Sequence, residues 1–213
     1  MIRRGVAAAV ISVAGLLRAA PLEAHRLDEY LQATRLSIGS GRVDVELDLT
    51  PGAAIAERIA RDIDVDGDGR FSAAEADVYA RSVLATLTLA ADGRALAMTL
   101  EGQTLPERAA MFEGVGTIRL RAAATLPSRS SGRHTLEYRN DFQPAASVYL
   151  ANTLVPDDPR ITIDAQDRDP LQQRLTVTYD VASSQTRRAG AVVASLAVFV
   201  IIIGRRRRLS ARP

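Results

Sequence analysis

The chain has 213 residues, no cysteine and 27 basic residues, all arginine, against 25 acidic ones. This length suffices for one domain with a buried core, and the lack of cysteine excludes disulfides, thiolate metal sites and a cysteine nucleophile. Ten of the 27 arginines lie in the two ends, so residues 25–186 hold 17 arginines against 24 acids, a net charge of −7. The body is therefore acidic, and we expect no nucleic-acid partner.

Residues 1–24 are predicted to be a secretory signal peptide. Two arginines near the start are followed by an apolar run of 13 residues and then by small residues. Cleavage after Ala24 fits this three-part pattern. An uncleaved signal anchor is the alternative, but such a short apolar run is a poor membrane span. We therefore expect the body to be exported.

The body is predicted to be mainly β-structure. Apolar and polar residues alternate in 30–39 and 42–50, and Asp92-Gly93 marks a hairpin within 85–100. Glycine, proline and serine separate five further strand-like stretches, at 116–126, 133–140, 147–155, 160–166 and 174–181. About nine short strands with frequent turns favour an immunoglobulin-like β-sandwich over residues 25–182.

Residues 52–85 depart from this pattern and are predicted to form a helix–loop–helix insertion. The stretches 52–63 and 73–84 are rich in alanine and have helical composition, and an acidic loop lies between them. Because strand-like stretches precede and follow this segment, we expect it to lie between the second and third strands of the sandwich.

The acidic loop matches the twelve-residue calcium loop of an EF-hand. It has aspartates at positions 1, 3 and 5, a glycine at 6, an apolar residue at 8 and a glutamate at 12. The aspartates offer one oxygen each, position 7 its backbone carbonyl, the serine at 9 a bound water, and the glutamate two oxygens. The predicted calcium ligands are Asp64, Asp66, Asp68, Arg70, Ser72 and Glu75.

Donation of two oxygens by Glu75 favours Ca²⁺ over Mg²⁺, which demands tight octahedral geometry. Gly69 is expected to adopt a positive φ in the sharp turn. A solvated acidic turn is the alternative, although charges this close repel unless a cation joins them. The sequence holds no second copy of the loop, so we expect contacts with the β-domain or with a partner to stabilise this EF-hand.

Residues 189–204 are predicted to be a single transmembrane helix that follows a linker at 183–188. They are uncharged and mostly apolar, and arginines cluster after them in the tail 205–213. The positive-inside rule places this tail in the cytoplasm and the body outside, in agreement with the signal peptide. The segment also resembles sorting tails that some bacteria remove after export, so the anchor need not be permanent.

Several stretches together resemble the extracytoplasmic region of bacterial membrane proteins associated with nickel/cobalt permeases. They are AHRLDEYLQAT, VDVELDLTPG, the calcium loop, VYA and LTLAADGRAL, all within residues 24–100. Such regions start at a histidine after the signal peptide and carry DxDGDG before a strand hairpin. The sequence offers one apolar segment where a permease has many, so the resemblance implies an accessory or sensing role. It also implies a membrane permease or another surface protein as partner.

Other chemistry is sparse. After cleavage His25 would offer an amine and an imidazole together, a chelate for copper or nickel, or it merely follows the cleavage site. His134 lies in a strand-like stretch and is interpreted as a surface or core residue. The sequence has no nucleophile-elbow serine, no phosphate-binding glycine loop and no histidine pair for zinc. We therefore expect no enzyme.

These patterns predict an exported calcium-binding protein of the periplasm or cell surface, anchored in the cytoplasmic membrane by its C-terminal helix. Calcium is expected to act as a structural clamp on a recognition module. The alternative is an accessory protein that delivers or senses nickel, cobalt or copper for a permease. An enzyme with a dispersed site is a third hypothesis.

Overall fold

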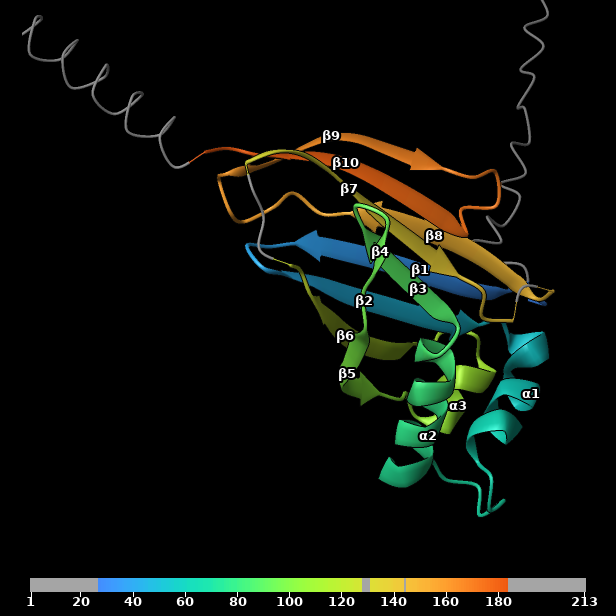
Figure 1. Cartoon of the computed structure of the whole chain (residues 1–213). Coiled ribbons are helices and arrows are strands. Elements are labelled where there is room, and N and C mark those ends of the chain that lie inside the picture. The colour runs from blue at the N-terminus through green and yellow to red at the C-terminus, as the bar shows by residue number, and fades with distance from the viewer. Residues whose placement is uncertain (1–26, 128–130, 144, 184–213) are drawn as a thin grey trace, which may run out of the picture.

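Two five-stranded β-sheets form most of the structure (Figure 1), a computed structural model that describes residues 27–127, 131–143 and 145–183. Sheet A contains β1 (Tyr30–Ile38), β2 (Arg42–Pro51), β5 (Met98–Thr104), β6 (Ile118–Thr125) and β8 (Ser147–Thr153). Sheet B contains β3 (Leu87–Ala91), β4 (Arg94–Ala95), β7 (Gly132–Asn140), β9 (Ile161–Arg168) and β10 (Arg174–Val181). The prediction of a mainly β protein is confirmed, and the two sheets agree with a β-sandwich.

The two sheets differ in their strand order, and sheet A contains one parallel strand pair. The order is β5-β6-β2-β1-β8 in sheet A and β4-β3-β7-β10-β9 in sheet B. Paired strands are antiparallel except at β1 and β8, which run parallel with Tyr30 opposite Ser147. The parallel pair brings together residues more than a hundred positions apart, so local sequence patterns do not reveal it.

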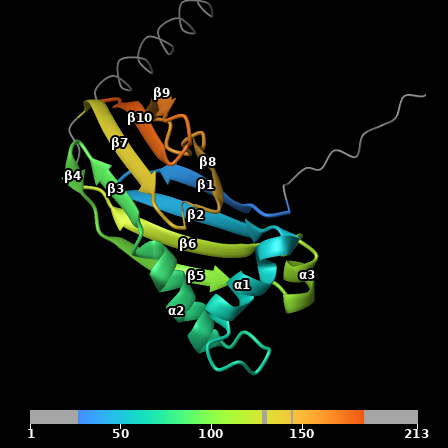
Figure 2. The ribbon, with the colours of Figure 1, turned by 90° about the vertical axis from the view of Figure 1, so that its right-hand side faces the viewer.

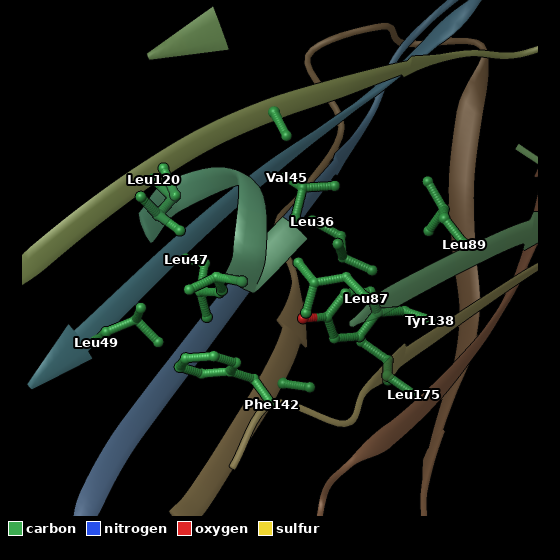
Figure 3. Packing of buried hydrophobic residues seen from close by; sticks show 14 of the residues in the cluster. Leu36, Val45, Leu47, Leu49, Leu87, Leu89, Leu120, Tyr138, Phe142 and Leu175 are labelled. Atoms are coloured by element: carbon green, nitrogen blue, oxygen red, sulfur yellow. The ribbon is translucent and has the colours of Figure 1, made fainter. Parts of the chain in front are cut away.

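The alternation of apolar and polar residues fixes which strand faces point inward. In β2 every second residue from Val43 to Leu49 is buried, and β1 has the same period. The inward rows of the two sheets meet in one apolar cluster, where Leu36 and Val45 face Leu89 and Leu175 (Figure 3). A one-residue slip of register would turn these leucines and valines to solvent, so burial specifies the register.

The hairpin predicted at Asp92-Gly93 forms, but its second arm divides between the sheets. Asp92 and Gly93 both have positive φ, 50° and 75°, as a two-residue hairpin turn requires. The returning strand β4 pairs with β3 over two residue pairs only, and the chain then joins sheet A as β5. The described residues therefore form ten strands where about nine were expected, because local periodicity does not reveal which sheet a strand joins.

The predicted insertion is present as helices α1 (Ala53–Ile63) and α2 (Ala73–Leu84), between β2 and β3. Each helix buries one stripe at helical spacing, which includes Ile59 and Ile63 in α1 and Tyr79 and Val83 in α2. Figure 2 shows both helices below sheet A, with the connecting loop pointing away from the strands.

A third helix, α3 (Arg108–Phe112), joins β5 to β6 and was not predicted. It contacts α1, and its Met111 is fully buried. Gly114, with φ of +73°, ends the helix, and a Cβ at Gly116 would lie 2.6 Å from the Met111 nitrogen. With five helical residues, α3 was too short to leave a periodic signal in the sequence.

A buried aromatic cluster docks the insertion on the sandwich. The Tyr30 hydroxyl of β1 and the Tyr79 hydroxyl of α2 are 2.8 Å apart and share a hydrogen bond. Phe142 packs edge-on against both rings, at centroid distances of 6.2 and 6.0 Å. Tyr138 links the sheets in the same way through a 2.9 Å hydrogen bond to Thr34. These contacts fix where the loop between α1 and α2 lies.

Several expectations concern segments outside the described residues. They are the signal peptide at 1–24, the transmembrane segment at 189–204 and the tail at 205–213, together with most of the linker at 183–188. Among the residues that the structure describes, no helix combines the length and apolar character needed to cross a bilayer.

Burial raises the pKa of the phenols of Tyr30, Tyr79 and Tyr138 above the usual value of 10.0. The folded protein thus holds these protons more tightly than the unfolded chain does, so this stability is complete below pH 10 and lost as the pH rises further. We expect tyrosinate absorbance of these residues to rise only together with alkaline unfolding, followed by circular dichroism. Titration of all five tyrosines near pH 10 in protein that remains folded would contradict this burial.

Candidate metal centre

The ends of two helices define the acidic loop. Asp64 is the C-cap of α1, and its N–H donates to the carbonyl of Ala60 at 2.8 Å. Between Asp64 and the start of α2, Gly67 and Gly69 have φ of +73° and +84°. A Cβ at either glycine would meet nothing within 4 Å, so backbone conformation and not crowding requires glycine there. The positive φ predicted for Gly69 is confirmed.

Three aspartates of the loop converge. Asp64, Asp66 and Asp68 each offer one carboxylate oxygen, and these oxygens lie within 4.8 Å of one another. Backbone N–H groups orient them: Gly69 donates to Asp64 Oδ2 at 3.0 Å, and Asp68 donates to Asp66 Oδ1 at 3.1 Å. The N–H of Arg70 donates to Asp68 Oδ1 at 2.8 Å. The fold therefore brings together the ligands predicted at positions 1, 3 and 5.

Asp64 differs from the other two aspartates in its burial. Its side chain is 5% exposed, whereas Asp66 and Asp68 are exposed. Among the residues that the structure describes, no hydrogen-bond donor reaches its Oδ1 atom. A buried carboxylate oxygen without a partner is unfavourable in a folded protein. A cation held between the three aspartates would supply the missing partner, so the donor set fits a metal ion.

The other oxygen of Asp64 is paired with an arginine from outside the insertion. Arg108, at the start of α3, donates from its Nη1 atom to Asp64 Oδ2 at 2.6 Å. Its guanidinium lies 5.2 Å from the Phe112 ring centre and 6.0 Å from that of Phe71, at loop position 8. Sequence reasoning missed Arg108, which is 44 positions from Asp64 and belongs to no motif. The loop therefore packs against α3 through these contacts.

Glu75 closes the loop from the other side. Its Oε1 atom accepts the N–H of Val65 at 2.8 Å, and its Oε2 atom accepts the N–H and hydroxyl of Ser72 at 2.9 and 2.8 Å. Hydrogen bonds, first of all from the Ser72 N–H, lower the pKa of Glu75 to about 2. Glu75 is not part of the aspartate cluster, so its ligation of a metal would exchange some of these hydrogen bonds for metal contacts.

The two remaining predicted ligands, Ser72 and Arg70, lie at the start of α2 and on the exposed side of the loop. Ser72 is the N-cap of α2, and its hydroxyl accepts the Glu75 N–H at 3.2 Å, which completes a capping box. Arg70 is exposed at position 7. The bound water proposed for Ser72 and the carbonyl contact proposed for Arg70 stay predictions.

The two histidines lie apart from the loop or outside the described residues. His134, in β7, pairs its Nδ1 atom with Asp92 Oδ2 at 2.8 Å and stacks on Tyr179 of β10. His25 precedes the described residues, so the alternative of nickel, cobalt or copper delivery stays an untested hypothesis.

Comparison with known proteins yields no relatives: no family model, curated protein or solved structure matches the chain. The functional argument therefore depends on the loop and its surroundings.

The capping box predicts a stability effect that is separate from metal binding. We expect Ser72→Ala to lower the free energy of unfolding by about 1 kcal/mol, because the Glu75 N–H loses its acceptor. Urea denaturation of the full-length chain in a chelator measures this difference. Ser40→Ala, exposed in the turn between β1 and β2, is the control, with an expected change under about 0.5 kcal/mol. Equal losses in both variants would refute the capping role.

Proposed function

We propose that residues 64–75 bind one calcium ion and that this ion stabilises the helical insertion 52–85. The buried carboxylate of Asp64 carries the proposal, because it clusters with those of Asp66 and Asp68 and its Oδ1 atom has no hydrogen-bond donor among the described residues. The structure of the loop supports this function through the positive φ of Gly69 and the backbone bonds to all three aspartates.

The donor chemistry favours calcium among the common metal ions. Carboxylate, carbonyl and water oxygens suit hard cations, whereas the loop offers neither imidazole nor thiolate to softer metals. Ca²⁺ accepts six to eight oxygens in flexible arrangements and commonly takes both oxygens of a position-12 glutamate. Glu75 stands at that position and accepts the N–H groups of Val65 and Asp66 in the loop.

The packing of the insertion favours a structural clamp over a switch. A sensor hand works by opening an apolar groove between its helices when calcium binds. Here the apolar faces of α1 and α2 are already buried against the sandwich, through Ile59, Ile63 and the Tyr30–Tyr79 contact. Opening the hand would expose this core, so bound calcium instead restrains the loop and the two helix ends beside it.

The cellular setting belongs to the same proposal. The protein is exported and held in the cytoplasmic membrane by residues 189–204, and its partner is a membrane permease or another surface protein. The immunoglobulin-like topology and the family resemblance also stay predictions, supported by the two-sheet architecture and by the sequence of residues 24–100.

Calcium binding is tested first by titration of the full-length chain in detergent after removal of metal. We expect one calcium per chain, and we expect Glu75→Gln to weaken binding roughly tenfold or more, because a charged ligand is lost. Glutamine still completes a capping box, so the helix start is preserved. Asp77→Asn, which removes a carboxylate from the same helix, should leave the affinity unchanged. No calcium-specific heat up to millimolar calcium, the weak end for extracellular modules, would exclude the proposal.

The clamp predicts where calcium stabilises the protein. At about 100 times its dissociation constant, calcium adds roughly 2.7 kcal/mol of stability, which raises the melting temperature by roughly 5 to 10 °C. Hydrogen exchange should show the gained protection mainly in residues 52–85. Dye binding that increases with calcium would reveal an opened apolar surface and would favour a switch instead.

A further inference from the structure

We propose that Arg108 is a built-in counter-cation of the calcium loop. It holds Asp64 in place when calcium is absent, and its positive charge weakens the binding of calcium. This inference rests on the proposed calcium function and extends it, because it assigns control of the affinity to a residue outside the loop.

The ion pair of Arg108 with Asp64 is the most buried of those formed by the described residues. The Asp64 side chain is 5% exposed, whereas the acidic partner in every other such pair is at least 15% exposed. Exposed charges are screened by water and salt, and buried ones much less. The charge of Arg108 therefore acts on this carboxylate with little attenuation.

The guanidinium cannot easily move away from the site. It lies over the rings of Phe71 and Phe112, where cation–π contacts hold it. The helix that carries it is anchored by the buried Met111 and by the close turn at Gly116. A long arginine on an open surface would swing away from an approaching cation, whereas Arg108 is held by contacts that do not involve the loop carboxylates.

The two carboxylate oxygens of Asp64 are available to different cations. Oδ2 accepts hydrogen bonds from Arg108 and from the Gly69 N–H, whereas Oδ1 has no donor among the described residues and is available to a metal ion. A calcium ion on Oδ1 would thus share one carboxylate with a guanidinium, and the two positive charges repel. Arg108 also reduces the formal charge of the four carboxylates from −4 to −3. Both effects weaken calcium binding toward the range of extracellular modules.

A purely structural role for Arg108 makes a different prediction. If the arginine only kept the loop in shape, its removal would lower both the stability and the calcium affinity. A counter-cation gives effects of opposite sign, because its loss destabilises the metal-free protein and strengthens the binding of calcium. The two roles are therefore separable by measuring both quantities on one variant.

The test uses Arg108→Gln in the full-length chain in detergent, with calcium titrated into metal-free protein. We expect calcium to bind roughly tenfold more tightly than in the wild type, together with a lower melting temperature in chelator. Affinity within twofold of the wild type, or weaker, would overturn the inference. If the glutamine variant does not fold, Arg108→Met, which keeps an apolar stem beside the two rings, takes the same test with the same criteria.

Arg61→Gln is the matched control, because it removes the same charge from the exposed last turn of α1, beside the loop. We expect its affinity to change less than about threefold, since solvent screens the Arg61 side chain. An equal gain in both variants would show a general charge effect and would refute the assignment to Arg108. A wild-type chain that binds no calcium would refute the proposed function itself, whereas binding that Arg108→Gln does not strengthen would refute only this inference.

Discussion

The apolar layer between the two sheets continues beneath the helical insertion, and the position of the acidic loop depends on this continuity. Leu47 and Leu49 of β2 belong to the same buried cluster as Ile59 of α1 and Val83 of α2. Because both helices bury their apolar stripes against the sandwich, the end of α1 and the start of α2 lie at fixed places. These two fixed ends determine the geometry of the loop, so the loop needs few apolar contacts of its own.

Charge sets the second constraint. The loop brings three carboxylates within 4.8 Å, an arrangement that is unfavourable without positive partners. Backbone N–H groups and Arg108 supply some of these, and the proposed calcium ion supplies the rest. Helix α3 supports the loop from outside the insertion, through Arg108 and the contact of its guanidinium with Phe71.

Much of this organisation was predictable from the sequence because it depends on neighbouring residues. The alternation in residues 30–50 predicted β1 and β2, and the composition of 52–85 predicted α1 and α2 to within a residue or two. The spacing of Asp64, Asp66 and Asp68 predicted that their carboxylates would meet, since side chains at alternate positions of a short, sharply turned loop point toward its centre. The turn at Asp92-Gly93 followed from the two residues themselves.

Other features were decided only by the tertiary structure. The parallel contact of β1 with β8 and the separation of β4 from β5 depend on which strands meet in space, and periodicity is the same in either sheet. The pairing of Arg108 with Asp64 likewise left no sequence pattern, and the Ser-x-x-Glu pattern of the capping box did not reveal that Glu75 would lie outside the aspartate cluster. The sequence by itself determined the local elements and the composition of the loop, because these arise from interactions a few residues apart. The burial of Asp64 and the cation beside it arise from contacts between distant segments, and only the packed fold creates those.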